Sequence, residues 1–151
     1  MAGRKIPMTN GSVLADTGYW FGLHDKTDSN RSRAIEIYNL LSPTKILLPW
    51  PIMYEVMNTR FLKNKPEFEK FYRQIFRPEF TRIDDAKYRE SALRSLEYLC
   101  IRKNRNISLV DAIIRKILQD TNVKIDCFVT FNKADFNDIV QHTRTLVLPR
   151  D

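Results

Sequence analysis

Short apolar runs alternate along this chain with longer segments that repeat apolar residues at helical spacing. The runs lie at residues 13–16, 45–49, 79–83, 127–131 and 145–149. Each run is short enough to form one strand. Strands that alternate with helices pair in parallel, because each crossover helix returns the chain to the same end of the sheet. The pattern therefore predicts an α/β fold with a mainly parallel sheet of four to five strands.

The segments between these runs predict helices that each place apolar residues on one stripe. They cover residues 32–41, 51–62, 66–76, 85–103 and 108–118. In the long segment 85–103 we expect Ala92, Leu93, Leu96, Leu99 and Cys100 to face inward. The aromatic stripe of 66–76 is expected in the core or in a protein interface. No Gly-rich phosphate-binding loop of the GxGxxG or GxxxxGK[ST] type occurs.

Length and charge limit the classes of protein and of partner. A chain of 151 residues is expected to form one domain, here residues 12–151 behind a flexible tail at 1–11. Lys and Arg exceed Asp and Glu by 25 to 18, which gives a net charge of +7. This excess favours a polyanionic partner, with nucleic acid ahead of an anionic membrane.

The two cysteines and the absence of long apolar segments indicate the compartment. Cys100 and Cys127 lie in apolar surroundings without the spacing of a zinc site, and they are interpreted as buried thiols in a reducing compartment. No apolar run is long enough to cross a membrane, and no signal-peptide pattern follows the basic start. We therefore expect a cytoplasmic protein without a membrane partner.

Acidic residues stand where several predicted elements begin or end. Asp16 ends the apolar run 13–15 and is followed by Thr17 and Gly18. Glu55 is a lone carboxylate among apolar neighbours, where a helix N-terminus alone would also favour an acid. Asp111 follows Ser108 by three residues, a spacing that helix capping by itself would explain.

A further polar segment follows the apolar run that begins at Cys127. Thr130 ends that run, and Asn132 and Asp135 lie in the predicted loop, where ordinary turn chemistry would also favour them. All these residues can converge on one sheet edge, where open α/β sheets bind ligands. Carboxylates about 4 Å apart repel by roughly 4 kcal/mol at an effective dielectric of 20. Several acids in one pocket therefore need a cation, and oxygen ligands without His or Cys favour Mg²⁺ or Mn²⁺.

These motifs resemble those of the PIN-domain nucleases, and especially of the small VapC-type toxins of toxin–antitoxin pairs. The motifs are VLADTGYW, the mid-chain YEV acid, SLVDAII and VTFNKADF, in the family's order over nearly the whole chain. The resemblance implies a PIN-like three-layer α/β/α fold. In one departure, Gly18 stands where the family usually has Asn or Ser.

The resemblance also implies roles for the acidic residues. Asp16, Glu55 and Asp111 would be acidic metal-site and catalytic residues, and Asp135, Asn132 or both would complete the site. Thr17, Thr130 and Ser108 would support them.

The implied activity is hydrolysis of RNA phosphodiester bonds assisted by Mg²⁺ or Mn²⁺. Arg102, Lys103 and Arg105, which precede Ser108, are candidates for guiding RNA to the site, although a solvated basic face would look the same. The aromatic residues 19–21 could stack bases or form a partner's pocket, but the core or a dimer interface is the favoured place for such a cluster. The family suggests a homodimer and an antitoxin protein as partners. The alternative is a non-catalytic RNA-binding or ribosome-associated protein on the same fold.

Overall fold

A computed structural model describes residues 11–150, so all of the tail predicted at residues 1–11 except Gly11 lies outside the described residues. The strands are β1 (Ser12–Ala15), β2 (Lys45–Pro49), β3 (Phe80–Ile83), β4 (Cys127–Val129) and β5 (Leu146–Leu148). They form one five-stranded sheet in the order β3-β2-β1-β4-β5, and all four pairings are parallel. The predicted α/β class and parallel sheet are confirmed.

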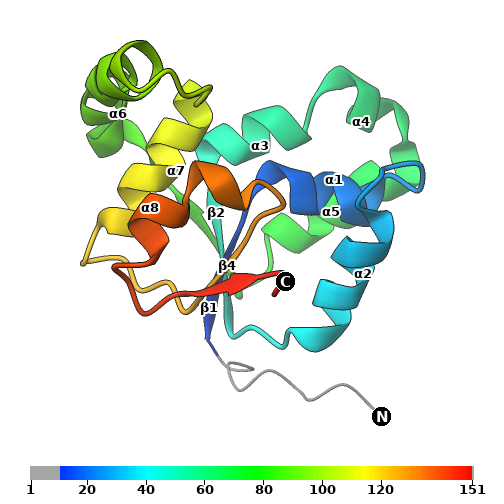
Figure 1. Cartoon of the computed structure of the whole chain (residues 1–151). Helices are drawn as coiled ribbons and strands as arrows, with labels where there is room; N and C mark the ends of the chain where they lie inside the picture. The colour runs from blue at the N-terminus through cyan, green and yellow to red at the C-terminus, as the bar shows by residue number, and fades with distance from the viewer. Residues whose placement is uncertain (1–10, 151) are drawn as a thin grey trace.

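Helices cover both faces of this sheet (Figure 1). The longer ones are α1 (Thr17–His24), α2 (Arg31–Leu40), α3 (Trp50–Val56), α5 (Lys65–Ile75), α6 (Arg89–Leu96) and α7 (Leu109–Gln119), and the shorter α4 (Thr59–Lys63) and α8 (Asn137–Val140) complete the set. In Figure 1, α6, α7 and α8 gather on one side of the strands, and α1, α2 and α5 on the other. This is the expected three-layer arrangement.

The order of the strands defines where a ligand site can form. The chain moves from β1 outward through β2 to β3, and then returns to place β4 on the other side of β1. The connections after β1 and after β4 therefore leave the sheet in opposite directions. Open parallel sheets bind ligands at such a point, beyond the carboxyl ends of the two strands. Asp16 and Thr130 are the residues that directly follow β1 and β4.

The core lies between the sheet and the two helical layers. Leu14, Leu48 and Phe128 supply fully buried side chains from three strands, while Phe71 of α5 and Ile114 of α7 cover them. Strands buried on both faces have near-continuous apolar sequences, as the sequence pattern required. The rigid sheet fixes the ends from which the polar residues project.

Three helical segments differ from the prediction. Helix α1 was not predicted, and it buries Tyr19 and Trp20 in the core. The predicted helix 51–62 divides into α3 and α4, because Asn58 accepts a hydrogen bond from the Phe61 N–H and begins a new helix. The predicted helix 85–103 consists of a 3₁₀ turn, α6 and a π-helix at Glu97–Arg102.

Some apolar side chains expected inside are exposed. Leu93 is 56% exposed. Two residues of the aromatic stripe, Tyr72 and Phe76, are 48% and 59% exposed. Phe71 and Ile75, on the same stripe, are buried. Among residues 11–150, no helix combines the length and the apolar character that crossing a bilayer requires.

Candidate active site

Asp16 lies at the centre of the sheet edge, directly after β1. It is the N-cap of α1, where Oδ1 accepts a 2.8 Å hydrogen bond from the Thr17 N–H. The Thr130 hydroxyl, beyond β4, donates to Oδ2 at 3.2 Å. The side chain is buried, and burial raises the pKa of Asp16 against the lowering effect of these two bonds. The charges of Glu55 and Asp135 raise it further.

Thr17 connects the first helix to the second acid. Its hydroxyl donates a 2.8 Å hydrogen bond to Oε1 of Glu55, which projects from the last turn of α3. One residue thus binds Asp16 through its backbone and Glu55 through its side chain. Glu55 is exposed at the surface of this edge.

Asp111 reaches the same edge from the first turn of α7. The Ser108 hydroxyl oxygen accepts a 3.0 Å hydrogen bond from the Asp111 N–H, so Ser108 caps the helix as its sequence spacing predicts. Burial raises the pKa of Asp111 to about 7, and the charges of Asp16, Asp135 and Glu55 contribute to this increase. The backbone of Asp111 therefore takes part in helix capping, while its carboxylate belongs to the acidic group.

The loop after β4 supplies the last of the predicted residues. Asp135 ends a 3₁₀ turn, η3 (Lys133–Asp135), and its charge raises the pKa of both Asp16 and Asp111. Asn132 is exposed, and its backbone N–H donates a 3.0 Å hydrogen bond to the Thr130 hydroxyl oxygen. The electrostatic coupling therefore includes Asp135 in the acidic group, while Asn132 supports Thr130.

Acids from four segments distant in sequence thus lie within electrostatic reach of Asp16 and Asp111. Carboxylate oxygens without His or Cys are the donors that Mg²⁺ and Mn²⁺ prefer, so this donor set fits such a cation in its chemistry. As they stand, no three or more His, Cys, Asp or Glu side chains within residues 11–150 are arranged to hold a metal ion. Mutual repulsion opposes a closer approach of these acids unless protons or a cation neutralise them.

The three predicted RNA-binding residues differ in their surroundings. Arg102 and Lys103 are exposed at the end of the π-helix. Arg102 Nη2 lies 3.7 Å from Oε1 of Glu97, and Lys103 lies over the Tyr98 ring. Arg105 instead turns toward the η3 loop, where it donates to the Ala134 carbonyl and to Asp138.

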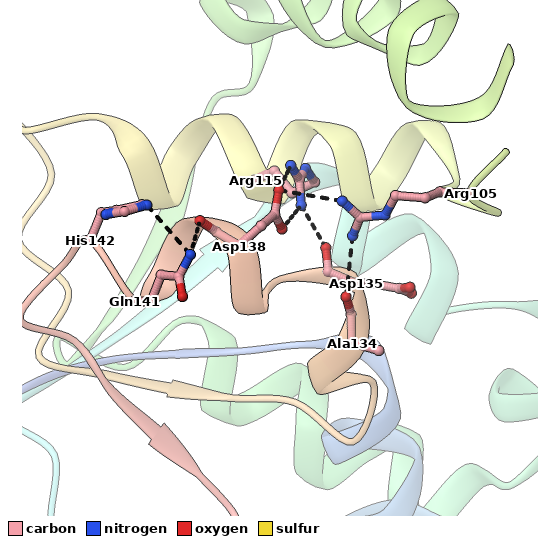
Figure 2. A network of polar contacts seen from close by, with 7 residues as sticks. All are labelled: Arg105, Arg115, Ala134, Asp135, Asp138, Gln141 and His142. Carbon is pink, nitrogen blue, oxygen red and sulfur yellow. Dashed lines mark hydrogen bonds and ion pairs between the residues drawn. The ribbon is translucent and has the colours of Figure 1, made fainter. Parts of the chain in front are cut away.

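An ion pair that the sequence pattern did not predict lies next to Asp135 (Figure 2). Arg115 of α7 is buried, and its Nη1 and Nη2 each donate a 2.7 Å hydrogen bond to one carboxylate oxygen of Asp138. This pairing lowers the pKa of Asp138 to about 2. The signal available in the sequence was an arginine inside the apolar stripe of 108–118, one turn after Asp111.

The sequence matches no protein-family model and no curated protein. Solved structures that share its fold include the following two. VapC20 of Mycobacterium tuberculosis, described as a sarcin–ricin loop cleaving toxin, is 16% identical with a TM-score of 0.63 over 84% of this chain and 95% of that one. VapBC2 of Rickettsia felis, bound to a DNA fragment from its promoter, is 15% identical with a TM-score of 0.56 over 90% of this chain and 96% of that one. The chain therefore has a VapC-like PIN-domain fold.

Proposed function

We propose that this protein is a metal-dependent endoribonuclease that hydrolyses RNA phosphodiester bonds and acts as the toxin of a toxin–antitoxin pair. The observation that carries the proposal is that the charges of Glu55 and Asp135 act on both Asp16 and Asp111 at the switch point of the sheet. Ionising Asp16 and Asp111 costs stability in the metal-free protein, because burial and the neighbouring acids raise the pKa of both. Acids kept at such a cost favour a functional role over a stabilising one. The likeness to VapC20 supports RNA as the substrate class.

The acids would hold Mg²⁺ or Mn²⁺, with Asp135 as the fourth carboxylate. A bound divalent cation neutralises charge on the scissile phosphate and lowers the pKa of a water that attacks it. The chain's own residues set the direction of the acids: Thr130 and the Thr17 N–H orient Asp16, and the Thr17 hydroxyl orients Glu55. Ser108 fixes the backbone of Asp111.

The net charge of +7 supports a polyanionic substrate. Arg102 and Lys103 are exposed and belong to a segment that leads to Asp111 through Ser108, so they would bind the RNA backbone on its way to the acids. The guanidinium of Arg105 is already engaged by Ala134 and Asp138, which assigns it a smaller share of RNA binding. An antitoxin partner is proposed from the likeness to the VapBC2 complex, and a homodimer remains part of the proposal.

Cleavage of a labelled RNA by the purified protein tests this function. A single-stranded RNA that contains a hairpin loop is incubated with Mg²⁺, Mn²⁺ or EDTA, and the ends of the products are identified. We expect metal-dependent internal cleavage with 5′-phosphate and 3′-hydroxyl ends. The variant Asp111→Asn should be inactive, while Asp84→Asn, an acid outside the group, should retain activity. Binding of RNA without cleavage in any metal would instead support the non-catalytic RNA-binding alternative.

A further inference from the structure

Arg115 forms a contact that its pairing with Asp138 does not explain. In addition to that ion pair, its Nη1 donates a 2.7 Å hydrogen bond to the backbone carbonyl oxygen of Asp135. In Figure 2 the carbonyl of Asp135 faces the guanidinium, while its side-chain oxygens point to the other side. The arginine therefore holds the backbone of one member of the acidic group without competing for its carboxylate.

The same arginine shares a helix with another member of the group. Asp111 and Arg115 are four residues apart in α7 and lie on neighbouring turns of one face. Asp135 and Asp138 belong to η3 and α8, which approach α7 from the end of β4. Arg115 thus joins the helix that carries Asp111 to the turn that carries Asp135.

The link through Arg115 opposes the electrostatic repulsion between two acids. Asp111 and Asp135 both belong to the acidic group, and two carboxylates repel each other when both are ionised. The bonds of Arg115 to the Asp135 carbonyl and to the Asp138 carboxylate hold the turn to α7 against that repulsion. Arg105 adds a second link, since its Nη2 donates a 3.1 Å hydrogen bond to the carbonyl oxygen of Ala134.

We propose that Arg115 is a positioning residue, which keeps Asp135 in the acidic group by holding the η3–α8 turn against α7, with Asp138 orienting the guanidinium. The inference rests on the proposed function, because it assigns to Asp135 a share in metal binding. Arg115 acts through Asp135 and touches neither substrate nor metal.

Mn²⁺ affinity measured by calorimetry on the full chain, without RNA, tests the proposal. Arg115→Met keeps the apolar stem and removes the guanidinium, and we expect its affinity to fall by about 10- to 100-fold, as for other residues that orient metal ligands. Arg115→Lys, which cannot bind both partners in the same fork geometry, should recover only part of this loss. Asp138→Asn should have a smaller effect, because Arg115 keeps its bond to Asp135.

A double-variant comparison separates positioning from a general loss of structure. If Arg115 acts through Asp135, Arg115→Met should add nothing to the affinity loss of Asp135→Ala. If the two losses multiply instead, Arg115 acts by another route and the proposal is wrong. Arg82→Met is the matched control, because Arg82 also donates a 2.7 Å hydrogen bond to a backbone carbonyl, that of Ile75, away from the four acids. It should leave Mn²⁺ affinity unchanged.

If the wild-type protein binds no Mn²⁺, that failure counts against the proposed function alone. Hydrogen exchange in metal-free buffer then tests the role of Arg115. In Arg115→Met the amides of the turn should lose protection. They include the Phe136 N–H, which donates to the Lys133 carbonyl, and the Ile139 N–H, which donates to the Phe136 carbonyl. The amides in the interior of α7 should keep theirs. Unchanged protection of the turn would overturn the role of Arg115.

Discussion

The hydroxyl of Thr17 lies 2.8 Å from Oε1 of Glu55 and donates a hydrogen bond to it. This bond joins the first turn of α1 to the last turn of α3, two helices that leave the sheet from different strands. Glu55 is exposed, and an exposed glutamate otherwise samples several rotamers. Thr17 therefore restricts the one acid of the group that burial does not hold in place.

Thr17→Val should reduce RNA cleavage by about 10- to 100-fold, the usual effect of losing a group that orients a metal ligand. Valine has nearly the shape of threonine and fits the same buried site, so the melting temperature should change little. Thr17→Ser keeps the hydroxyl and should retain most of the activity. Equal activity in the valine variant and the wild type would mean that Glu55 needs no orientation.

Gly22→Ala should destabilise the protein, because α1 and α2 pack closely at this position. A Cβ atom at Gly22 would lie 2.6 Å from the Cβ of Ala34 and 3.2 Å from the carbonyl oxygen of Asn30. At Gly18, on the same helix, the nearest atom would be Cδ2 of Phe131 at 3.4 Å, an ordinary contact.

Chemical denaturation of both variants measures this difference. Overpacking costs about 1–3 kcal/mol, so Gly22→Ala should be less stable than Gly18→Ala by about that amount. The comparison removes most of the gain in helix propensity, which both variants share. Equal stability would show that α2 moves away from α1 at little cost. Gly18→Ala should also fold normally, so the absence of Asn or Ser there is not forced by lack of space.

The acid-bearing ends of the elements were predictable because a strand that is buried on both faces stops abruptly at its first polar residue. Asp16 and Thr130 mark such ends in the sequence, and the parallel sheet then places them side by side. Helix α1 was not predictable by periodicity, because it buries Thr17, Tyr19, Trp20, Gly22 and His24 and has no polar face.

Interactions between distant segments were also beyond sequence pattern. Arg115 and Asp138 are 23 positions apart, and Arg105 and Ala134 are 29 apart. Nothing in the spacing of Arg102, Lys103 and Arg105 distinguishes the two exposed side chains from the one that the η3 turn engages. That distinction depends on where β4 ends and where α7 begins in space.

The affinity for RNA should decrease with salt, and Arg102 and Lys103 should account for part of that dependence. Replacing both with serine should reduce the slope of log K against log salt by about 0.7 for each phosphate of single-stranded RNA that the protein no longer neutralises. Both side chains are exposed, so the melting temperature should remain unchanged. Arg105→Ser should instead lower the melting temperature, because it removes the bonds to Ala134 and Asp138. An unchanged slope in the double variant would assign both residues to a solvated face.

The stability of the metal-free protein should depend on pH through Asp111. Its pKa is about 7 in the folded state, against an ordinary value of 3.8. Between these values the folded state holds a proton that the unfolded state has released, so Asp111 destabilises the fold progressively as pH rises from about 4 through 7. His24 acts in the opposite direction, since burial lowers its pKa and stability is lost as pH falls.

Melting temperatures of the wild type and Asp111→Asn, compared in EDTA across this pH range, isolate the effect because His24 is common to both. The melting temperature of the asparagine variant should increase relative to that of the wild type as pH rises. Added Mn²⁺ should reduce this advantage, because a cation stabilises the carboxylate form. Parallel pH profiles in EDTA would show that Asp111 ionises without electrostatic cost.

The change Asp16→Asn should abolish RNA cleavage and leave the fold intact. Asparagine retains an oxygen that accepts from the Thr17 N–H, and its amide nitrogen can donate to the Thr130 hydroxyl oxygen in place of the bond that Thr130 now donates. The negative charge is lost, and with it the attraction for a divalent cation. Activity should fall to that of the EDTA-treated wild type.

The same substitution should raise the melting temperature in EDTA. Burial disfavours the ionised form of Asp16, and Glu55 and Asp135 add repulsion, so a neutral side chain relieves both costs. The matched control is Asp126→Asn at the opposite end of the sheet, where Asp126 accepts from the Ser12 N–H and asparagine can do the same. That variant should keep its activity. An inactive protein that is no less stable is the result expected of a metal-site acid. Unfolding of Asp16→Asn, or full activity, would make Asp16 a structural helix cap.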